Sequence, residues 1–133
     1  MPVASVGDTA DASITVTEET IEAYADLSGD HNPIHGDDEY ASETMFGGRI
    51  AHGMLSAAPI SAALADLPGD VVYLSQDLRF ENPVRPGDTV TAHVEVLEDL
   101  GDDRLRVDTR AEADETVVAG EAVVLSLPHE DGQ

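Results

Sequence analysis

A segment that is apolar on every side constrains the fold of this chain more than any other feature. Residues 53–67 read GMLSAAPISAALADL, and only Ser56, Ser61 and Asp66 are polar. A helix that is hydrophobic all round is buried rather than lying on the surface. Pro59 removes one backbone hydrogen bond, so a kink or an irregular turn is expected there. The rest of the chain must therefore supply a surface that covers this helix.

The second half of the chain supplies that surface as four successive strands joined by short turns. Residues in each stretch alternate between two faces, as in half-buried strands. In chain order, the residues that share one face of each strand are Leu74, Gln76, Leu78 and Phe80; Val90, Ala92, Val94 and Val96; Leu105, Val107, Thr109, Ala111 and Ala113; and Val117, Ala119, Glu121, Val123 and Leu125. In the last of these strands the opposite face is also largely apolar. A first strand is expected over 8–16. The pattern predicts an α+β fold in which one curved antiparallel sheet wraps around the buried helix.

The length of 133 residues is that of one domain, and we expect a single domain over 1–133 in which 128–133 form a frayed tail. The chain has no cysteine, so it has no disulfides and no thiolate metal site. No apolar stretch approaches the ~20 residues that cross a membrane. The N-terminus has neither the basic region nor the apolar core of a signal peptide, and we therefore expect a cytoplasmic protein.

A turn over residues 29–35 carries the side chains best suited to chemistry. It reads GDHNPIH, with Asp30 and His35 on either side of Asn32 and Pro33. Pro33 fixes its own φ and pushes Asn32 towards extended geometry, so Asp30 and His35 do not lie on one regular helix face. Helices are expected on both sides of the turn. The first is capped by Thr17 and ends at residues 28–29.

The helix after the turn is expected to be short. It starts at Asp37 or Asp38 and carries Tyr40 and Ala41 inward.

The motif stretch resembles the MaoC-like dehydratases, and more narrowly the (R)-specific enoyl-CoA hydratases. The matching residues follow in order along nearly the whole chain: Gly29-Asp30-x-Asn32-Pro33-Ile34-His35, Tyr40-Ala41, Phe46-Gly47, Ile50-Ala51-His52-Gly53-Met54-Leu55 and Phe80-x-x-Pro83-Val84-x-x-Gly87-Asp88. This resemblance implies a single hot-dog domain. It also implies reversible hydration of a trans-2-enoyl-CoA to an (R)-3-hydroxyacyl-CoA, and a homodimer.

The resemblance implies that Asp30 and His35 are the acid–base pair that holds the attacking water, and we assign Asp30 as the base and His35 as the proton donor. Asn32 would brace the turn, and Ser61 would hydrogen-bond within the site and orient the acid. Gly53 fits an oxyanion donor on physical grounds. It begins the apolar helix, its N–H has no intrahelical partner, and it has no side chain to obstruct a thioester carbonyl.

Substrate contacts are expected from residues beside these segments. His52 and Met54 flank Gly53, although packing is an alternative role for His52. Arg49, Arg79 and Arg85 are candidates for the phosphates of coenzyme A, and charge pairs at a strand edge are an equal alternative. No cofactor is expected, because coenzyme A is part of the substrate. A metal site built from Asp30, His35 and His52 is possible by residue type, but hydration beside a thioester needs no metal and none is expected.

Other functions remain open. Asp30 alone could cap a turn, and His35 alone could be a partly buried histidine with satisfied hydrogen bonds. Within the family, the substrate could be a carrier-protein-bound thioester or a branched or carboxylated acyl-CoA. A hot-dog protein that binds acyl thioesters without turnover is a third possibility. The product could feed storage polyester (polyhydroxyalkanoate) synthesis, or the reaction could belong to fatty-acid breakdown.

The charge of the chain is strongly acidic and is spread over its whole length. Asp and Glu number 28 against six Arg and no Lys, which gives a net charge of −22. This balance argues against binding to nucleic acids or anionic membranes, because both need basic patches. The composition resembles proteins of extreme halophiles, such as haloarchaea, that keep molar salt in the cytoplasm. An ordinary acidic protein is the alternative.

The salt dependence of folding tests this interpretation of the charge. We expect secondary structure, measured by far-UV circular dichroism, to be lost in dilute buffer and regained in molar KCl. The reason is that charges on a compact chain repel one another, and the screening length falls from ~10 Å at 0.1 M salt to ~3 Å at 1 M. A cooperative, fully active protein at ~0.1 M salt would contradict the halophile interpretation.

Overall fold

The structure, a computed structural model, describes residues 1–129. Residues 130–133 of the expected tail lie outside the described residues. The elements follow one another in the order β1 (Thr9–Thr15), α1 (Glu18–Ser28), α2 (Pro33–Gly36), α3 (Asp38–Ser42), α4 (Gly53–Ala65), β2 (Asp70–Gln76), β3 (Arg79–Phe80), β4 (Thr89–Gly101), β5 (Arg104–Glu112) and β6 (Thr116–Leu127). No helix within 1–129 is long and apolar enough to cross a bilayer.

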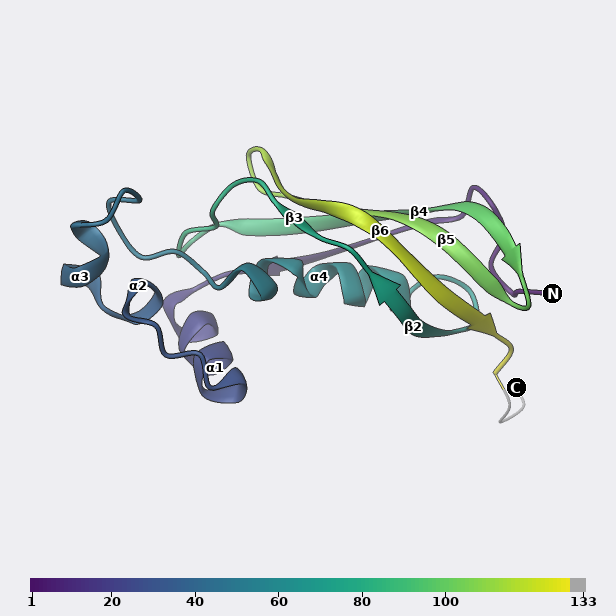
Figure 1. The fold of residues 1–133 in the computed structure, drawn as a ribbon, viewed down its shortest axis with the longest axis horizontal. Helices are drawn as coiled ribbons and strands as arrows, with labels where there is room; N and C mark the ends of the chain where they lie inside the picture. Colours follow the sequence, from purple (N-terminus) through teal and green to yellow (C-terminus); the bar gives the residue numbers. More distant parts are fainter. Residues whose placement is uncertain (130–133) are drawn as a thin grey trace.

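One antiparallel sheet forms the body of the protein, and α4 lies along one of its faces (Figure 1). The strand order is β1-β4-β5-β6-β2, and the short β3 pairs with β6. Helix α4 packs chiefly on β4 and β1. The helices α1, α2 and α3 gather at one end of the sheet, opposite the N-terminus and the end of β6 (Figure 1). The predicted hot-dog architecture, a curved antiparallel sheet on one apolar helix, is confirmed.

The inward faces of the central strands were readable from their alternation. Val90, Ala92, Val94 and Val96 of β4 are all buried, as is the predicted face of β5 from Leu105 to Ala111. In β6 the face that is buried holds Val118, Gly120, Ala122, Val124 and Ser126. Alternation cannot choose between the faces of β6, because both are largely apolar in sequence.

The prediction that α4 is buried on every side is wrong for the single chain. Its buried residues are Leu55, Ser56, Ala57, Pro59, Ile60, Ala63 and Leu64. The opposite side is exposed, with Met54 56% accessible and Ala58 and Ser61 open to solvent. On β2, Tyr73 and Leu74 are 43% and 50% exposed, and they line the same cavity as these three residues. We call these five residues the open apolar face.

The strand expected through residues 74–80 is broken in two after β2. At the break, the backbone N–H of Asp77 donates to the Glu121 carbonyl at 2.9 Å, and the Glu121 N–H donates to the Asp77 carboxylate at 3.1 Å. Residue 120 is glycine because a Cβ there would lie 2.0 Å from the Asp77 carbonyl oxygen. The break separates β3 from β2, and in β3 Phe80 lies against Gly53 at the start of α4.

The short helix α3 begins where expected, with Asp37 as its cap: the Asp37 carboxylate accepts from the Tyr40 N–H at 3.0 Å. Ala41 is fully buried, but the prediction that Tyr40 points inward is wrong, since it is 52% exposed. Adjacent residues on a helix are rotated by about 100° about its axis, so a helix this short buries only one of them.

Candidate active site

Two local signals in the sequence place Asp30 after the first helix. Thr17 caps α1 by accepting from the Thr20 N–H at 3.1 Å. Gly29 ends the helix at φ +81°, a conformation that glycine adopts without strain, and its N–H donates to the Ala25 carbonyl at 2.8 Å. The helix ends there, and Asp30 follows as the first side chain of the motif turn.

The Asn-Pro pair then starts α2 and places His35. The Asn32 side-chain oxygen accepts from the Ile34 N–H at 3.2 Å, which caps α2, and Pro33 occupies the first turn. The Asn32 N–H in turn donates to the Asp30 carboxylate at 3.2 Å. Asn32 therefore has the bracing position that the sequence suggested for it.

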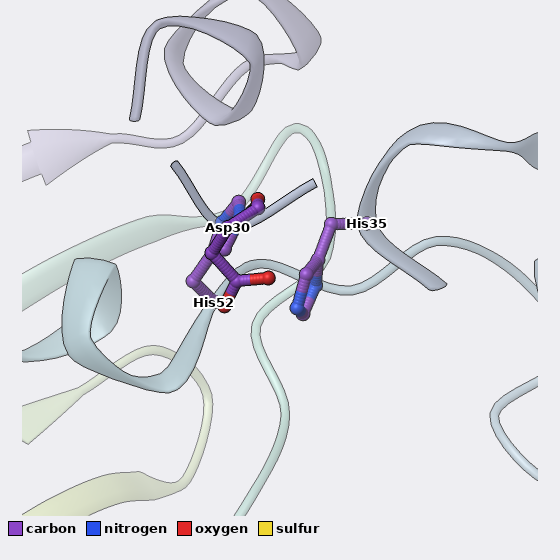
Figure 2. A group of neighbouring side chains, drawn as sticks. All are labelled: Asp30, His35 and His52. Carbon is purple, nitrogen blue, oxygen red and sulfur yellow. The ribbon is translucent and has the colours of Figure 1, made fainter. Parts of the chain in front are cut away.

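Asp30 and His35 approach one another, with His52 alongside (Figure 2). Ligand-type atoms of the three side chains lie within 4.8 Å of one another. The His35 Nδ1 lies 2.8 Å from the Ile50 carbonyl oxygen. A carbonyl oxygen only accepts hydrogen bonds, so Nδ1 carries the proton. In the neutral ring, Nε2 therefore keeps a free lone pair, which suits acid–base chemistry.

Two hollows open beside the pair and share His35. The acidic hollow, about 240 Å³, is lined by Glu22, Asp26, Asp30 and His35 among others. The aromatic hollow, about 290 Å³, contains Phe46, Phe80, Gly53 and again His35. Asp30 is exposed and His35 half-buried. A small molecule in the acidic hollow can therefore reach both Asp30 and His35, and one in the aromatic hollow can reach His35.

Gly53 begins α4, and its N–H is therefore free of an intrahelical partner. It lines the aromatic hollow with His35. A Cβ at this position would lie 3.1 Å from the Phe80 ring, tighter than ordinary van der Waals contact. The glycine thus has two explanations: access for a substrate carbonyl, or space for Phe80.

The geometry of the three side chains suits proton transfer better than a resident metal. The His35 and His52 rings stack with their centroids 3.9 Å apart and their planes at 29°. Ring lone pairs lie in the ring planes, so stacked rings aim them side by side rather than at one point. One nitrogen of each ring also already contacts a backbone carbonyl.

Ser61 and Met54 lie elsewhere in the single chain. Both line the apolar cavity, a space of about 410 Å³ between α4 and β2 whose lining also includes Tyr73, Leu74 and Leu78. None of its lining residues borders the two hollows. The hydrogen bond expected from Ser61 to the acid–base pair is absent within the described chain. Ser61 is eight residues beyond Gly53, which corresponds to ~12 Å along a helix.

Arg49, expected as a phosphate contact, has a structural role instead. It is 8% exposed and pairs with Glu18 at 2.9 Å and Asp38 at 2.8 Å, joining the start of α1 to α3. Burial lowers the pKa of this guanidinium, but the hydrogen bonds that it donates to Glu18 and Asp38 outweigh burial and raise its pKa overall. Its charge is already neutralised by two carboxylates, so the prediction for Arg49 is wrong.

The other two arginines are accessible. Arg85 donates to the Phe46 carbonyl at 2.5 Å, above the aromatic hollow. Arg79 lines a hollow of the sheet surface together with four carboxylates, those of Asp77, Glu81, Asp108 and Glu121. Arg85 is therefore the accessible candidate that is hydrogen-bonded to a residue lining the aromatic hollow.

His52 is 3% exposed and borders neither hollow nor the apolar cavity. The structure therefore gives it a packing position behind the site rather than the predicted contact with substrate. Sequence reasoning missed two of the groups around the pair. One is the Ile50 carbonyl that orients His35. The other is Tyr24, whose ring lies 4.7 Å from that of His52. In the sequence Tyr24 is one of several apolar residues within the first helix and nothing distinguishes it from the others, and no pattern marks a backbone carbonyl.

Comparison with known proteins gives consistent matches. The model of the MaoC like domain matches residues 3–119. The (R)-specific enoyl-CoA hydratase of Rhodospirillum rubrum is 44% identical over 123 residues, which cover 90% of this chain and 85% of that protein. The 3-hydroxybutyryl-CoA dehydratase of Methylorubrum extorquens is 45% identical over 114 residues, covering 82% and 72%. Among solved structures, the unliganded R-hydratase PhaJ1 of Pseudomonas aeruginosa superposes with a TM-score of 0.87 at 41% identity, covering 96% of this chain and 88% of that one.

Proposed function

Because this chain belongs to the MaoC-like domain family, we propose that it is a hydro-lyase that reversibly hydrates trans-2-enoyl-CoA to (R)-3-hydroxyacyl-CoA. The observation that carries the proposal is the accessible pair of Asp30 and His35, which adjoins the N-terminus of the apolar helix at Gly53. The two relatives named above act on CoA thioesters according to their names. No metal or other cofactor is proposed, and coenzyme A enters as part of the substrate.

In the proposed reaction a water molecule lies between the Asp30 carboxylate and the His35 Nε2. As the water oxygen bonds to the β-carbon, Asp30 takes one of its protons. The electron pair of the double bond moves towards the thioester carbonyl, whose oxygen gains negative charge beside the Gly53 N–H and the positive end of the α4 dipole.

The α-carbon then receives its proton from His35. Since Nδ1 is tied to the Ile50 carbonyl, His35 donates from Nε2 in its protonated form. The proton on Asp30 returns to Nε2 across the short gap, which restores the starting state. Dehydration follows the same steps in reverse.

The apolar cavity is proposed as the acyl site. Its lining, from Met54 and Ile60 of α4 to Leu74 of β2, is mostly apolar, and its volume of about 410 Å³ is large enough for a small acyl group. In a single chain the open apolar face leaves this cavity uncovered. We propose that a second copy of the chain covers it in a homodimer, because a contiguous exposed apolar surface marks an interaction site.

The oligomeric state tests this arrangement. Sedimentation in molar KCl is expected to give the mass of two chains, and Leu74→Asp to give one chain, because it places a charge on a residue 50% exposed at the open apolar face. Leu27→Asp is the control, since Leu27 is 86% exposed on α1. Monomeric wild-type protein, or a dimer unaffected by Leu74→Asp, would contradict the proposal.

The activity test is hydration of crotonyl-CoA in molar KCl, followed by loss of the enoyl absorbance and by the configuration of the product. Wild type is expected to give the (R)-alcohol, and Asp30→Asn and His35→Gln each to lower kcat by about 10²–10⁴-fold, the usual contribution of a positioned acid or base.

Matched controls come from the acidic hollow that Asp30 lines. Asp26→Asn and His31→Gln change an exposed acid and histidine that line it with Asp30, and both should keep wild-type kcat. Wild-type turnover by Asp30→Asn would contradict the mechanism. Turnover of a carrier-bound or branched thioester alone would change the substrate, and thioester binding without any turnover would favour a binding protein.

A double variant separates the two explanations of Gly53. Gly53→Ala is expected to lower kcat by about 10²-fold by obstructing the carbonyl, and to lower the free energy of unfolding by about 1–3 kcal/mol by crowding Phe80. Adding Phe80→Ala should relieve the crowding and so recover the free energy of unfolding that the crowding cost. The kcat of the double variant should stay as low as that of Gly53→Ala. Recovery of kcat as well would show that residue 53 is glycine only to accommodate the Phe80 ring.

A further inference from the structure

His52 is the most enclosed of the titratable groups near the site, and the mechanism above gives it no step. It is 3% exposed and immediately precedes α4. Its Nε2 lies 2.9 Å from the backbone carbonyl oxygen of Asp30, and its ring stacks on that of His35 at 3.9 Å. One buried side chain therefore contacts both members of the acid–base pair.

The hydrogen bond fixes the tautomer of His52. The Asp30 carbonyl only accepts, so Nε2 carries the proton and Nδ1 of the neutral ring is a bare acceptor. That Nδ1 is buried and has no hydrogen-bond partner among the described residues. A proton placed there would find no acceptor, and the ring is therefore unsuited to passing protons through the site.

Hydrogen bonds of Ile50 and His52 join the segment before α4 to the motif turn. The Ile50 N–H donates to the Ile34 carbonyl at 3.4 Å, the Ile50 carbonyl accepts from His35 Nδ1, and His52 Nε2 donates to the Asp30 carbonyl. Within residues 1–129, the other hydrogen bonds of Asp30 are local: its N–H donates to the Ser28 hydroxyl, and its carboxylate accepts from the Asn32 N–H. Its position relative to His35 and to the start of α4 therefore depends on His52.

We propose that His52 is a positioning residue for the acid–base pair. Its N–H holds the backbone of Asp30, and its ring face orients the imidazole of His35 so that Nε2 faces the shared space. Tyr24 packs against the same ring at 4.7 Å and 53° and limits its rotation. This inference rests on the proposed hydratase function, and it assigns His52 no contact with the substrate.

Two substitutions separate the two contacts. His52→Gln retains an N–H at the position of Nε2 but loses the stacked ring, whereas His52→Phe retains a ring but loses the donor. Each is expected to lower kcat for crotonyl-CoA by about 10-fold or more while leaving KM nearly unchanged, since a small misplacement of catalytic groups costs up to ~10²-fold. The pH profile of kcat should also change in both variants.

His93→Gln and His93→Phe are the controls, because His93 of β4 lines neither hollow of the site nor the apolar cavity and has a side chain 40% exposed. Circular dichroism in molar KCl establishes whether each variant folds. If His52 only fills space, folded variants will be less stable but will keep the wild-type kcat and pH profile, and this result would overturn the proposal.

A measurement on the wild type covers the case in which both variants fail to fold. Nitrogen NMR of the histidine rings, recorded at a pH at which both rings are neutral, should show His35 as the Nδ1–H tautomer and His52 as the Nε2–H tautomer. Tautomers that average freely in either ring would overturn the proposal. Because this readout needs no turnover, a protein that turns over none of these enoyl thioesters but has both tautomers fixed would refute the proposed function and leave the positioning contacts intact.

Discussion

The packing of α4 on the sheet is the contact on which the rest of the structure depends. The residues of α4 that face the sheet are small or aliphatic, and they meet the inward faces of β1, β4 and β5. Burial of this apolar surface is the main favourable contribution to folding in a chain with only five aromatic residues, two Phe and three Tyr. The same packing fixes where α4 begins, and so where the Gly53 N–H and the preceding His52 lie relative to the motif turn.

Repulsion between the many carboxylates opposes folding, and around the site an arginine is paired with two of them. The sheet carries paired charges on its outer face, for example Arg106 with Glu98 and Glu121 at 3.0 Å each. Exposed pairs of this kind contribute little to stability, and less at high salt. Arg49 differs because it is buried between two carboxylates that belong to separate helices. It joins the ends of α1 and α3 around the turn that carries Asp30 and His35.

The sequence allowed the fold to be predicted where alternation had one apolar face, as in β4 and β5, and where capping residues such as Thr17 and Gly29 marked helix ends. It was ambiguous where both faces were apolar, as in β6. The sequence pattern wrongly predicted one continuous strand through residues 74–80. The break at Asp77 depends on hydrogen bonds between Asp77 and Glu121, a residue far along the chain.

The candidate site was partly readable for the same reasons. Asp30 and His35 are separated by a turn whose residues restrict the backbone locally, and the structure brings them together. The roles of Arg49, Ser61 and His52 could not be predicted in this way, because they depend on which side chains meet in space. Periodicity does not encode such contacts. The apolar pattern of α4 predicted burial correctly for the side that packs on the sheet but not for the opposite side, which is exposed in the single chain.

The separation of the apolar cavity from the acid–base pair has an evolutionary consequence. The groups proposed for the chemistry all come from one continuous stretch that ends at Gly53, whereas one wall of the cavity comes from β2 and the residues just after it. The two parts are joined through α4 but share no lining residues. With the acyl site and the acid–base pair proposed above, mutations in β2 can alter the shape of the cavity while leaving the proton-transfer groups in place, so that new acyl specificities can arise without change to the motif turn.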